Sequence, residues 1–203
     1  MATFQAIAVT GNTIRNLLAE AWPRDLFPGA QFQLCQAANL VSPPFTDLGV
    51  SVYLHRVAYN MTRRNLPPRK RLNGRRFKPS LPLDLHFLLT AWARKPEQQW
   101  ALLAWAIRAI EDTPVLPGGL LNQNAGSDAD GTSPNVFGDD ESVELVGETL
   151  SLQDMVSVWE IAKPNQQPSV SIVARAVLID SLVEMPDAGL AQTRRFDVAP
   201  VKT

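Results

Sequence analysis

Eight of the chain's nineteen lysine and arginine residues lie between positions 62 and 79, in the stretch TRRNLPPRKRLNGRRFKP, which contains no acidic residue. Most of the eight are arginines, whose planar guanidinium group pairs through two hydrogen bonds with carboxylates and phosphates. The stretch therefore predicts a surface that binds an anionic partner. The candidate interface residues are Arg63, Arg64, Arg69, Lys70, Arg71, Arg75, Arg76 and Lys78.

Nucleic acid and protein are the two classes of anionic partner that such a stretch could bind. Surfaces that bind single-stranded nucleic acid interleave basic residues with aromatic ones, but Phe77 is the only aromatic residue here. The four prolines between positions 67 and 82, together with Gly74, favour an extended segment over a recognition helix. We therefore expect a basic arm, residues 62–79, that docks onto carboxylates of a protein. A nucleic-acid-binding module that uses residues 63–78 is the alternative.

The residues that could catalyse a reaction are few. Asp84 and His86 stand two apart on a predicted strand, so they share one face and could act as a base with its orienting acid. Structural hydrogen bonds are the more common role for such a pair. A lone cysteine such as Cys35 is more often a small core residue than a nucleophile. Since the sequence also lacks the usual phosphate-binding, zinc-binding and nucleophile motifs, we expect no enzyme activity, no cofactor and no metal site.

The hydrophobic pattern predicts the elements that position these residues. Residues 3–22 and 96–112 favour helices, and a capping-box-like start at Ser151 predicts a third, short helix. The predicted strands are residues 30–40, 49–60, 81–92, 141–150 and 169–183. This order indicates a single α+β domain, residues 1–183, with a largely antiparallel or mixed sheet flanked by about three helices. Residues 184–203 are expected to form an extended tail.

Two further segments indicate contacts outside a simple core. The helix at 96–112 is apolar on every side from Trp100 to Ile107, which predicts burial by the domain's own core or by a neighbouring subunit. Residues 122–141 are acidic, rich in glycine and without period, so we expect a mobile surface loop.

Charge is divided unevenly along the chain. Of its 203 residues, the first 100 carry a balance of +8 and the remaining 103 a balance of −9, although the net charge is only −1. This asymmetry is compatible with a charged face that meets a complementary partner, including another copy of the chain. Two loops of opposite sign that are merely solvated are the alternative. The longest apolar run, WALLAWAI, is too short to span a membrane, so a soluble protein made in the cytoplasm is expected.

Several stretches together resemble one known family. The runs IRNLLAEAW, LPLDLHFLLTAWA, AIEDTPVL, LSLQDMVSVWE and PSVSIVARAVLIDS occur in this order. Their order and spacing, and the arginine- and proline-rich connection before LPLDLH, resemble the tail-terminator, or cap, family of extracellular contractile injection systems, which are phage-tail-like particles. The resemblance covers roughly residues 3–183. The acidic segment 122–141 is longer than the family pattern requires.

The resemblance implies a structural role without catalysis. Members of this family are expected to form a homohexameric ring at the end of the particle distal to the baseplate. There the ring would contact the inner-tube protein and the sheath protein, end their polymerisation and anchor the sheath. The resemblance implies no cofactor, no membrane span and no nucleic-acid partner. It further implies assembly in the cytoplasm, in a particle that is either released from the cell or retained in it.

Overall fold

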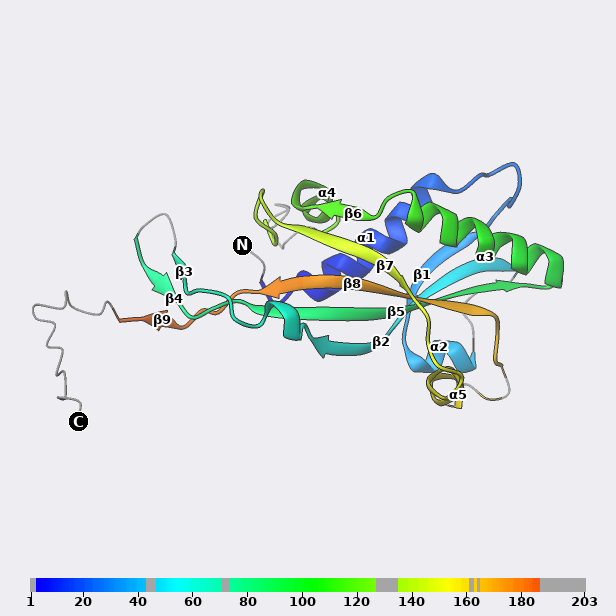
Figure 1. Cartoon of the computed structure of the whole chain (residues 1–203). Coiled ribbons are helices and arrows are strands. Elements are labelled where there is room, and N and C mark those ends of the chain that lie inside the picture. The colour runs from blue at the N-terminus through cyan, green and yellow to red at the C-terminus, as the bar shows by residue number, and fades with distance from the viewer. Residues whose placement is uncertain are drawn as a thin grey trace, which may run out of the picture.

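A six-stranded mixed sheet forms the centre of the fold (Figure 1). The computed structural model describes residues 3–42, 47–70, 74–126, 135–160, 163 and 165–186. The strand order is β1-β2-β5-β8-β7-β6, in which β1 is parallel to β2 and the other neighbours are antiparallel. The strands are β1 (Gln31–Cys35), β2 (Leu48–Tyr59), β5 (Leu81–Ala93), β6 (Val115–Pro117), β7 (Ser142–Glu148) and β8 (Ser169–Ile179). The predicted α+β class with a mixed sheet is confirmed.

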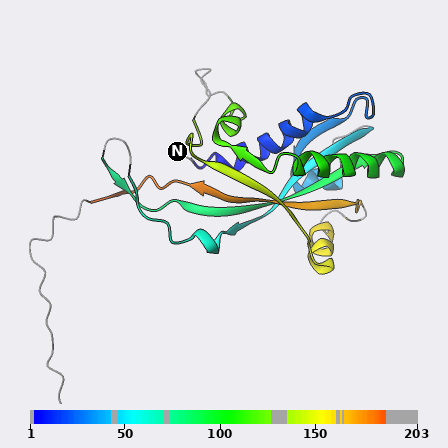
Figure 2. The same cartoon turned by 45° about the horizontal axis from the view of Figure 1, so that its top comes forward.

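Strand β5 separates two apolar clusters, because successive side chains of a strand point to opposite faces. Leu85, Phe87 and Leu89 belong to the larger cluster, which α1 (Ala6–Ala21) and α3 (Pro96–Glu111) cover. Leu88 and Trp92 point the other way, into a smaller cluster beneath α2 (Ala37–Val41) and α5 (Leu152–Glu160). The helices therefore lie on both faces of the sheet, as Figures 1 and 2 show.

The predicted helix ends agree with the local chemistry of the sequence. Pro96 stands in the first turn of α3 beside the acidic Glu97, which suits the positive end of the helix dipole. At the start of α5, the Ser151 hydroxyl accepts a hydrogen bond from the backbone N–H of Asp154 at 3.1 Å. This is the contact that the capping pattern predicts.

The basic arm lies in a second, three-stranded sheet that extends from one end of the main sheet (Figure 2). The 3-10 helix η1 (Met61–Arg63) overlaps the first residues of the arm. The strands of this sheet are β3 (Arg69–Lys70), β4 (Arg76–Phe77) and β9 (Glu184–Met185), in the order β3-β4-β9. The arm thus contributes two short strands to this sheet. The segment predicted as a tail begins with a strand that pairs with the arm.

The sequence prediction was wrong at residues 36–40, which were expected to continue a strand and instead begin α2. The Asn39 side chain accepts a hydrogen bond from the backbone N–H of Gln36 at 2.9 Å. The Gln36 side chain in turn accepts a hydrogen bond from the backbone N–H of Asn39. This reciprocal capping stabilises a short helix where the alternation of side chains had suggested a strand.

The domain's own core buries only one side of α3. Gln99, Leu102, Ala106 and Ile110 are buried, whereas Trp100 and Ile107 remain exposed on the outer side. Complete burial within the chain, one of the two alternatives for this helix, is therefore wrong. Burial of the outer side by a neighbouring subunit stays a prediction.

The two ends of segment 122–141 are ordered parts of the fold rather than a mobile loop. Helix α4 (Gly118–Gln123) includes its first residues, and Val136 and Phe137 are buried. The Asn122 side-chain oxygen accepts a hydrogen bond from the backbone N–H of Phe137 at 2.9 Å, and its amide nitrogen donates one to the backbone C=O of Phe137 at 3.0 Å. Residues 127–134, which carry part of the predicted acidic loop, lie outside the described residues.

Candidate interaction site

Seven of the eight candidate interface residues are described, and they divide into two groups. Arg69 is half-buried and forms ion pairs with Glu141 and Asp180, and Arg75 forms an ion pair with Glu184 of β9 at 2.8 Å. The other five residues are exposed or half-buried: Arg63, Arg64, Lys70, Arg76 and Lys78. Arg71 lies outside the described residues.

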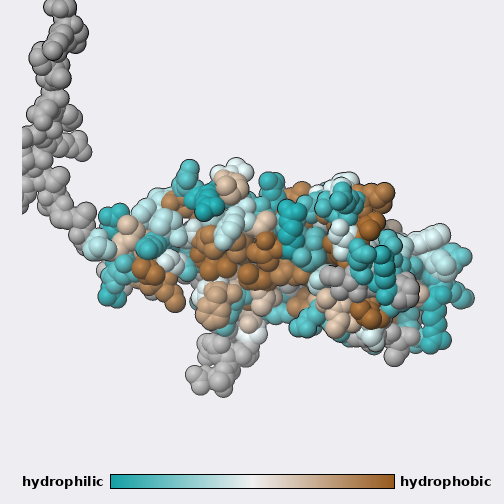
Figure 3. All heavy atoms as spheres, turned by 90° about the horizontal axis from the view of Figure 1, so that it is seen from below, coloured by the Kyte–Doolittle hydropathy of each residue, from teal (hydrophilic) through white to brown (hydrophobic). Residues whose placement is uncertain are grey.

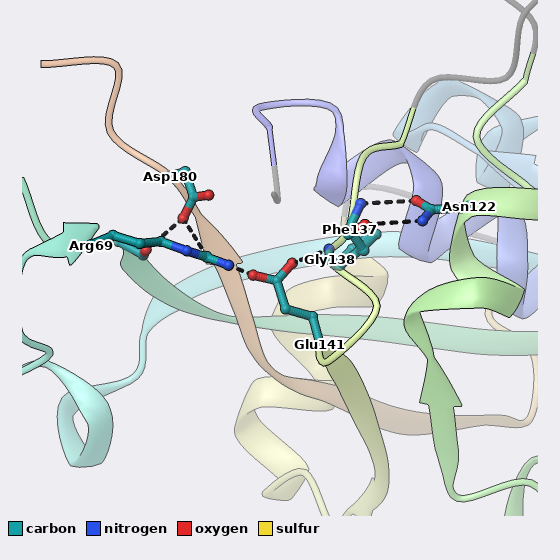
Figure 4. Close-up of polar contacts among 7 residues, drawn as sticks. Arg69, Asn122, Phe137, Gly138, Glu141 and Asp180 are labelled. Atoms are coloured by element: carbon teal, nitrogen blue, oxygen red, sulfur yellow. Dashed lines mark hydrogen bonds and ion pairs between the residues drawn. The ribbon is translucent and has the colours of Figure 1, made fainter. Parts of the chain in front are cut away.

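Arg69 stands between two acidic side chains that join the arm to the main sheet (Figure 4). Its Nη1 donates hydrogen bonds to Glu141 Oε1 at 2.6 Å and to Asp180 Oδ1 at 2.8 Å. The Ser80 hydroxyl donates to the same Asp180 oxygen at 2.5 Å. We call these four residues the Arg69 cluster. The Arg69 side chain is 26% exposed, whereas the Glu141 and Asp180 side chains are only 9% and 8% exposed.

The main sheet determines where the Arg69 cluster forms. Leu81 pairs with Ile179 across β5 and β8, so Ser80 and Asp180 leave the sheet side by side. Glu141 is held by its second oxygen, because Oε2 accepts the backbone N–H of Gly138 at 2.7 Å. The turn packs against Gly118, where a side chain would collide with the Gly138 carbonyl oxygen. A glycine at 118 therefore lets this turn place Glu141 beside the arm.

The electrostatics of the Arg69 cluster keep the arginine charged. Burial by itself lowers the pKa of Arg69, but the hydrogen bonds and charges of Glu141 and Asp180 more than offset this, and the net shift is upward. Two buried carboxylates without a cation would repel each other and lose their solvation. The cluster thus acts as a fixed ionic link between the arm and the body.

A cavity of about 330 Å³ adjoins the Arg69 cluster. Its lining includes two guanidinium groups, from Arg63 and Arg69, and two carboxylates, from Asp140 and Glu141. The mixed signs favour neither an anion nor a cation as a ligand. The cavity therefore adds solvated polar surface beside the cluster rather than a defined binding site.

The exposed part of the arm continues onto the outer edge of β2. The Arg64 guanidinium group lies over the Tyr59 ring at 5.3 Å from its centroid. Strand β1 pairs only with Gly49 to Tyr53, so among the described strands none lies beside the second half of β2 on that side. Figure 3 shows an apolar area on this face of the molecule. The exposed large apolar side chains of β2 and η1 are Val57, Tyr59 and Met61.

Asp84 and His86 make structural hydrogen bonds, as the more common of their two interpretations predicted. Asp84 Oδ1 accepts from the Asn60 side-chain amide and from the backbone N–H of Ala176, both at 2.9 Å. His86 Nδ1 lies 2.9 Å from Glu148 Oε2. Each side chain is thus bound to a different partner, and the two do not form a base with its orienting acid.

The two histidine rings lie close together on the face of the sheet that α5 borders. The His55 and His86 ring centroids are 6.1 Å apart, with the rings edge to face. Burial lowers the pKa of His55, the neighbouring His86 lowers it further, and Glu148 partly opposes the shift. Burial raises the pKa of Glu148, but hydrogen bonds from His86 and Ser171 outweigh it and the net shift is downward.

Cys35 is a buried free thiol, in agreement with its prediction as a core residue. Burial raises its pKa to about 11, so the thiol stays protonated and unreactive at neutral pH. Among the described residues, no group of three or more His, Cys, Asp and Glu side chains is placed to hold a metal ion. None of the described helices has the length and apolar character needed to cross a membrane.

Sequence reasoning missed the acidic partners of the arm. It singled out the eight basic residues but not Glu141, Asp180 or Glu184. The one available signal was the position of Asp180 directly after a strongly apolar strand, where a polar side chain marks the sheet's edge. Its pairing with Arg69 depends on the order of the strands, which the pattern does not give.

Comparison with known proteins identifies the family. The family model of the Pvc16 N-terminal domain matches residues 10–193. Among solved structures, the chain is similar to a PVC sheath/tube terminator of an extracellular contractile injection system in the extended state. The TM-score is 0.57 and the identity 13%, over 95% of this chain and 64% of that one.

The tube-terminating cap of the anti-feeding prophage is similar as well, with a TM-score of 0.53 and 12% identity over 95% of this chain and 60% of that one. At such identities the likeness shows a shared fold, and the chain spans less than two thirds of either structure's length. No curated protein matches the sequence. The family model, which covers most of the sequence, shows that the chain belongs to the Pvc16 N-terminal domain family.

Proposed function

We propose that the chain is a structural cap, or tail terminator, of a contractile injection particle. The observation that carries the proposal is the family match over residues 10–193, joined to a fold shared over 95% of the chain with a sheath/tube terminator. In this role it ends polymerisation of the inner tube and sheath at the baseplate-distal end and anchors the sheath. Such a role requires no reactive group, so we propose no catalysis and no cofactor.

A cap must close laterally while it binds the last ring of a polymer. We propose that copies of the chain form a homohexameric ring that contacts the inner-tube and sheath proteins. A ring requires head-to-tail contacts, in which one surface of a copy meets a different surface of the next. The charge asymmetry of the sequence and the exposed apolar side chains of α3 and β2 support this arrangement.

The exposed residues of the basic arm are the proposed docking contacts to the neighbouring protein. Lys70 in β3 and Lys78 directly after β4 are exposed on the projecting sheet, and Arg64 is exposed directly after η1, whereas Arg69 holds the arm to its own body. We propose that the chain assembles in the cytoplasm and becomes part of a particle that is released or retained. Carboxylates of the chain bind Arg69 and Arg75, two of the basic residues that the nucleic-acid-binding alternative would use.

Deletion of the gene tests the proposed function. Particles from the deletion strain should have tubes or sheaths of uncontrolled length, or fail to assemble, when measured by electron microscopy. Reintroduction of the full chain should restore a uniform length. Particles of normal length and full activity in the deletion strain would contradict the proposal.

A further inference from the structure

Helix α5 is attached to the main sheet through few buried side chains. Among the nine described residues of α5, only Trp159 is buried, and its ring packs against Trp92 at a centroid distance of 6.4 Å. Met155 and Val158 add partly buried contacts to the same cluster. A helix this short is not stable in water by itself, since isolated helices of fewer than about 12–15 residues are marginal. The position of α5 therefore depends on a small interface with the sheet.

Two buried ring nitrogens beside this interface lack hydrogen-bond partners among the described residues. They are Nε1 of Trp159 on α5 and Nε2 of His55 on β2. A buried polar atom without a hydrogen bond destabilises the state that buries it. Both nitrogens therefore favour a movement of α5 that admits water, so the interface that holds the helix also opposes its closed position.

A cavity of about 300 Å³ lies between β2 and α5, on the face of the sheet opposite α1 and α3 (Figures 1 and 2). Its lining comes mainly from these two elements: Tyr53, His55 and Arg56 of β2, and Asp154, Ser157 and Val158 of α5. The half-buried His55 ring therefore borders the space that separates the strand from the helix. A change in the charge of this ring acts on both walls of the cavity.

The groups that face His55 from the sheet do not offer it a free carboxylate. His86 of β5 lies edge to face with it at a centroid distance of 6.1 Å, and Arg56 follows it on β2. Glu148 of β7 is the neighbouring acid. Its Oε2 already lies 2.9 Å from His86 Nδ1 and accepts a hydrogen bond from the Ser171 hydroxyl at 2.9 Å. A proton on His55 would therefore add a positive charge beside Arg56 without a new ion pair in the sheet.

Asp154 is the acid that faces His55 from α5, across the cavity. Its Oδ2 accepts a hydrogen bond from the Ser151 hydroxyl at 2.6 Å, and its backbone N–H donates to the same hydroxyl at 3.1 Å. The carboxylate is thus held at the helix start, where the positive end of the helix dipole favours it. Tyr53 completes the titratable groups of the lining. Neither group is a hydrogen-bond partner of His55 Nε2.

We propose that α5 is a proton-controlled flap, which opens from the sheet when the His55 ring takes up a proton. A protonated imidazole donates hydrogen bonds from both ring nitrogens, and with α5 closed Nε2 has no acceptor among the described residues. Opening admits water to this nitrogen and to Nε1 of Trp159. Burial and the neighbouring His86 lower the pKa of His55 while α5 is closed, so protons bind the open form more tightly and shift the equilibrium towards it.

Hydrogen–deuterium exchange of the full chain measures the opening at about pH 7.5 and pH 5.5. The lower value is about one unit below the ordinary histidine pKa of 6.5, so proton binding can raise the open population by at most about tenfold. Glu148 stays ionised there, because its pKa is shifted downward from 4.5. The protection of the α5 amides, corrected for the pH dependence of chemical exchange, should therefore fall several-fold. Equal protection at the two pH values would overturn the proposal.

Low concentrations of urea separate the opening of α5 from unfolding of the whole domain. A local opening exposes little surface, so the exchange of the α5 amides should be nearly independent of urea. The amides of β5, at the centre of the sheet, should be more strongly protected and should exchange faster as urea is added. If the α5 amides shared the protection and the urea dependence of β5, the helix would open only with the whole domain, and the flap would be rejected.

Substitution of each histidine identifies the group that takes up the proton. In His55→Gln the ratio of the α5 protections at the two pH values should be close to one. Because the ratio is taken within one variant, a substitution that loosens α5 equally at both pH values still gives an answer. The matched control is His86→Gln, which leaves His55 in place and should keep the pH dependence. A pH dependence that survives in His55→Gln, or that is lost in His86→Gln, would contradict the proposal.

The sign of the change is a further test. Slower exchange of the α5 amides at the lower pH would show that charged His55 attracts Asp154 across the cavity and holds the helix closed, which is the reverse of the proposal. All of these measurements use the purified chain. The inference therefore goes beyond the proposed function and does not depend on it, and its outcome is separate from particle length in the deletion strain.

Discussion

Asp84 Oδ1 accepts the backbone N–H of Ala176 at 2.9 Å, at the irregularity where β8 departs from its register with β5. Ala176 has a φ of 57°, in the left-handed region that favours glycine. The same oxygen accepts a hydrogen bond from Asn60, directly after β2. The Asp84 carboxylate therefore binds both a strained residue of β8 and the end of β2, which lies on the other side of β5.

Substitutions at these two positions should have opposite effects on stability. Ala176→Gly should raise the free energy of unfolding by about 0.5 kcal/mol, because relief of the left-handed strain, about 1–2 kcal/mol, exceeds glycine's extra entropy loss. Asp84→Ala should lower it by about 2 kcal/mol, because two donors lose a charged acceptor. Urea unfolding monitored by circular dichroism measures both. A destabilised Ala176→Gly variant would show that the alanine side chain matters more than the strain.

Removal of the central cation of the Arg69 cluster should destabilise the chain strongly. Arg69→Ala leaves the Glu141 and Asp180 carboxylates buried without a counter-charge and should cost about 3 kcal/mol in the free energy of unfolding. The matched control is Arg75→Ala, whose ion pair with Glu184 is solvent-exposed and should contribute less than about 1 kcal/mol. Equal losses for the two variants in urea unfolding would contradict a special role for the cluster.

The histidine pair should make stability fall at mildly acidic pH. Burial, reinforced by His86, lowers the pKa of His55 from its ordinary value of 6.5. Between the lowered pKa and 6.5 the unfolded chain binds more protons, so the free energy of unfolding decreases as the pH falls through this window. His55→Gln should flatten that slope in urea titrations at several pH values. An unchanged slope in the variant would assign it to another group.

Glu148 should contribute a second, separate loss at lower pH. Its pKa is shifted downward from 4.5 by hydrogen bonds from His86 and Ser171, which outweigh the effect of burial. Its contribution to stability is therefore present above 4.5 and is lost as the pH falls through the folded-state pKa. Glu148→Gln should remove this loss, and His55→Gln should leave it intact. A Glu148→Gln chain as acid-sensitive as the wild type would argue against the shift.

The exposed basic residues of the arm should matter for docking rather than for folding. Lys70→Glu with Lys78→Glu reverses two exposed charges and leaves Arg69 in place. We expect the purified variant to unfold like the wild type and to be incorporated into particles at a lower level, measured by quantitative immunoblotting of purified particles. Arg24→Glu, at an exposed position after α1, is the control and should be incorporated normally. Normal incorporation of the arm variant would reject the arm as a docking contact.

The periodicity of apolar residues in the sequence correctly predicted several helices and strands of the fold. The buried stripe of α1 and the long apolar run of β5 follow from side-chain periodicity, and both occur where expected. Helix α2 was missed because its stability comes from reciprocal capping by Gln36 and Asn39, which a hydrophobic pattern does not register. The division of α3 into a buried and an exposed side also escaped prediction, since both sides are apolar in sequence.

The candidate site was predicted only in part for a similar reason. The basic residues of the arm stand together in the sequence, so their composition is visible at once. Their partners Glu141 and Asp180 meet Arg69 only because β7 and β8 lie where the strand order places them. A pairing between distant segments has no local signature, and a single sequence does not reveal it.

The central position of β8 also sets the order of events during synthesis. Leu81 of β5 pairs with Ile179 of β8, and β7 pairs with the same strand from the other side. Both neighbours leave the ribosome before their shared partner, and such non-local pairing forms slowly. The main sheet is therefore incomplete until residue 179 has emerged, and the three-stranded sheet of the arm is completed later still, when β9 pairs with β4.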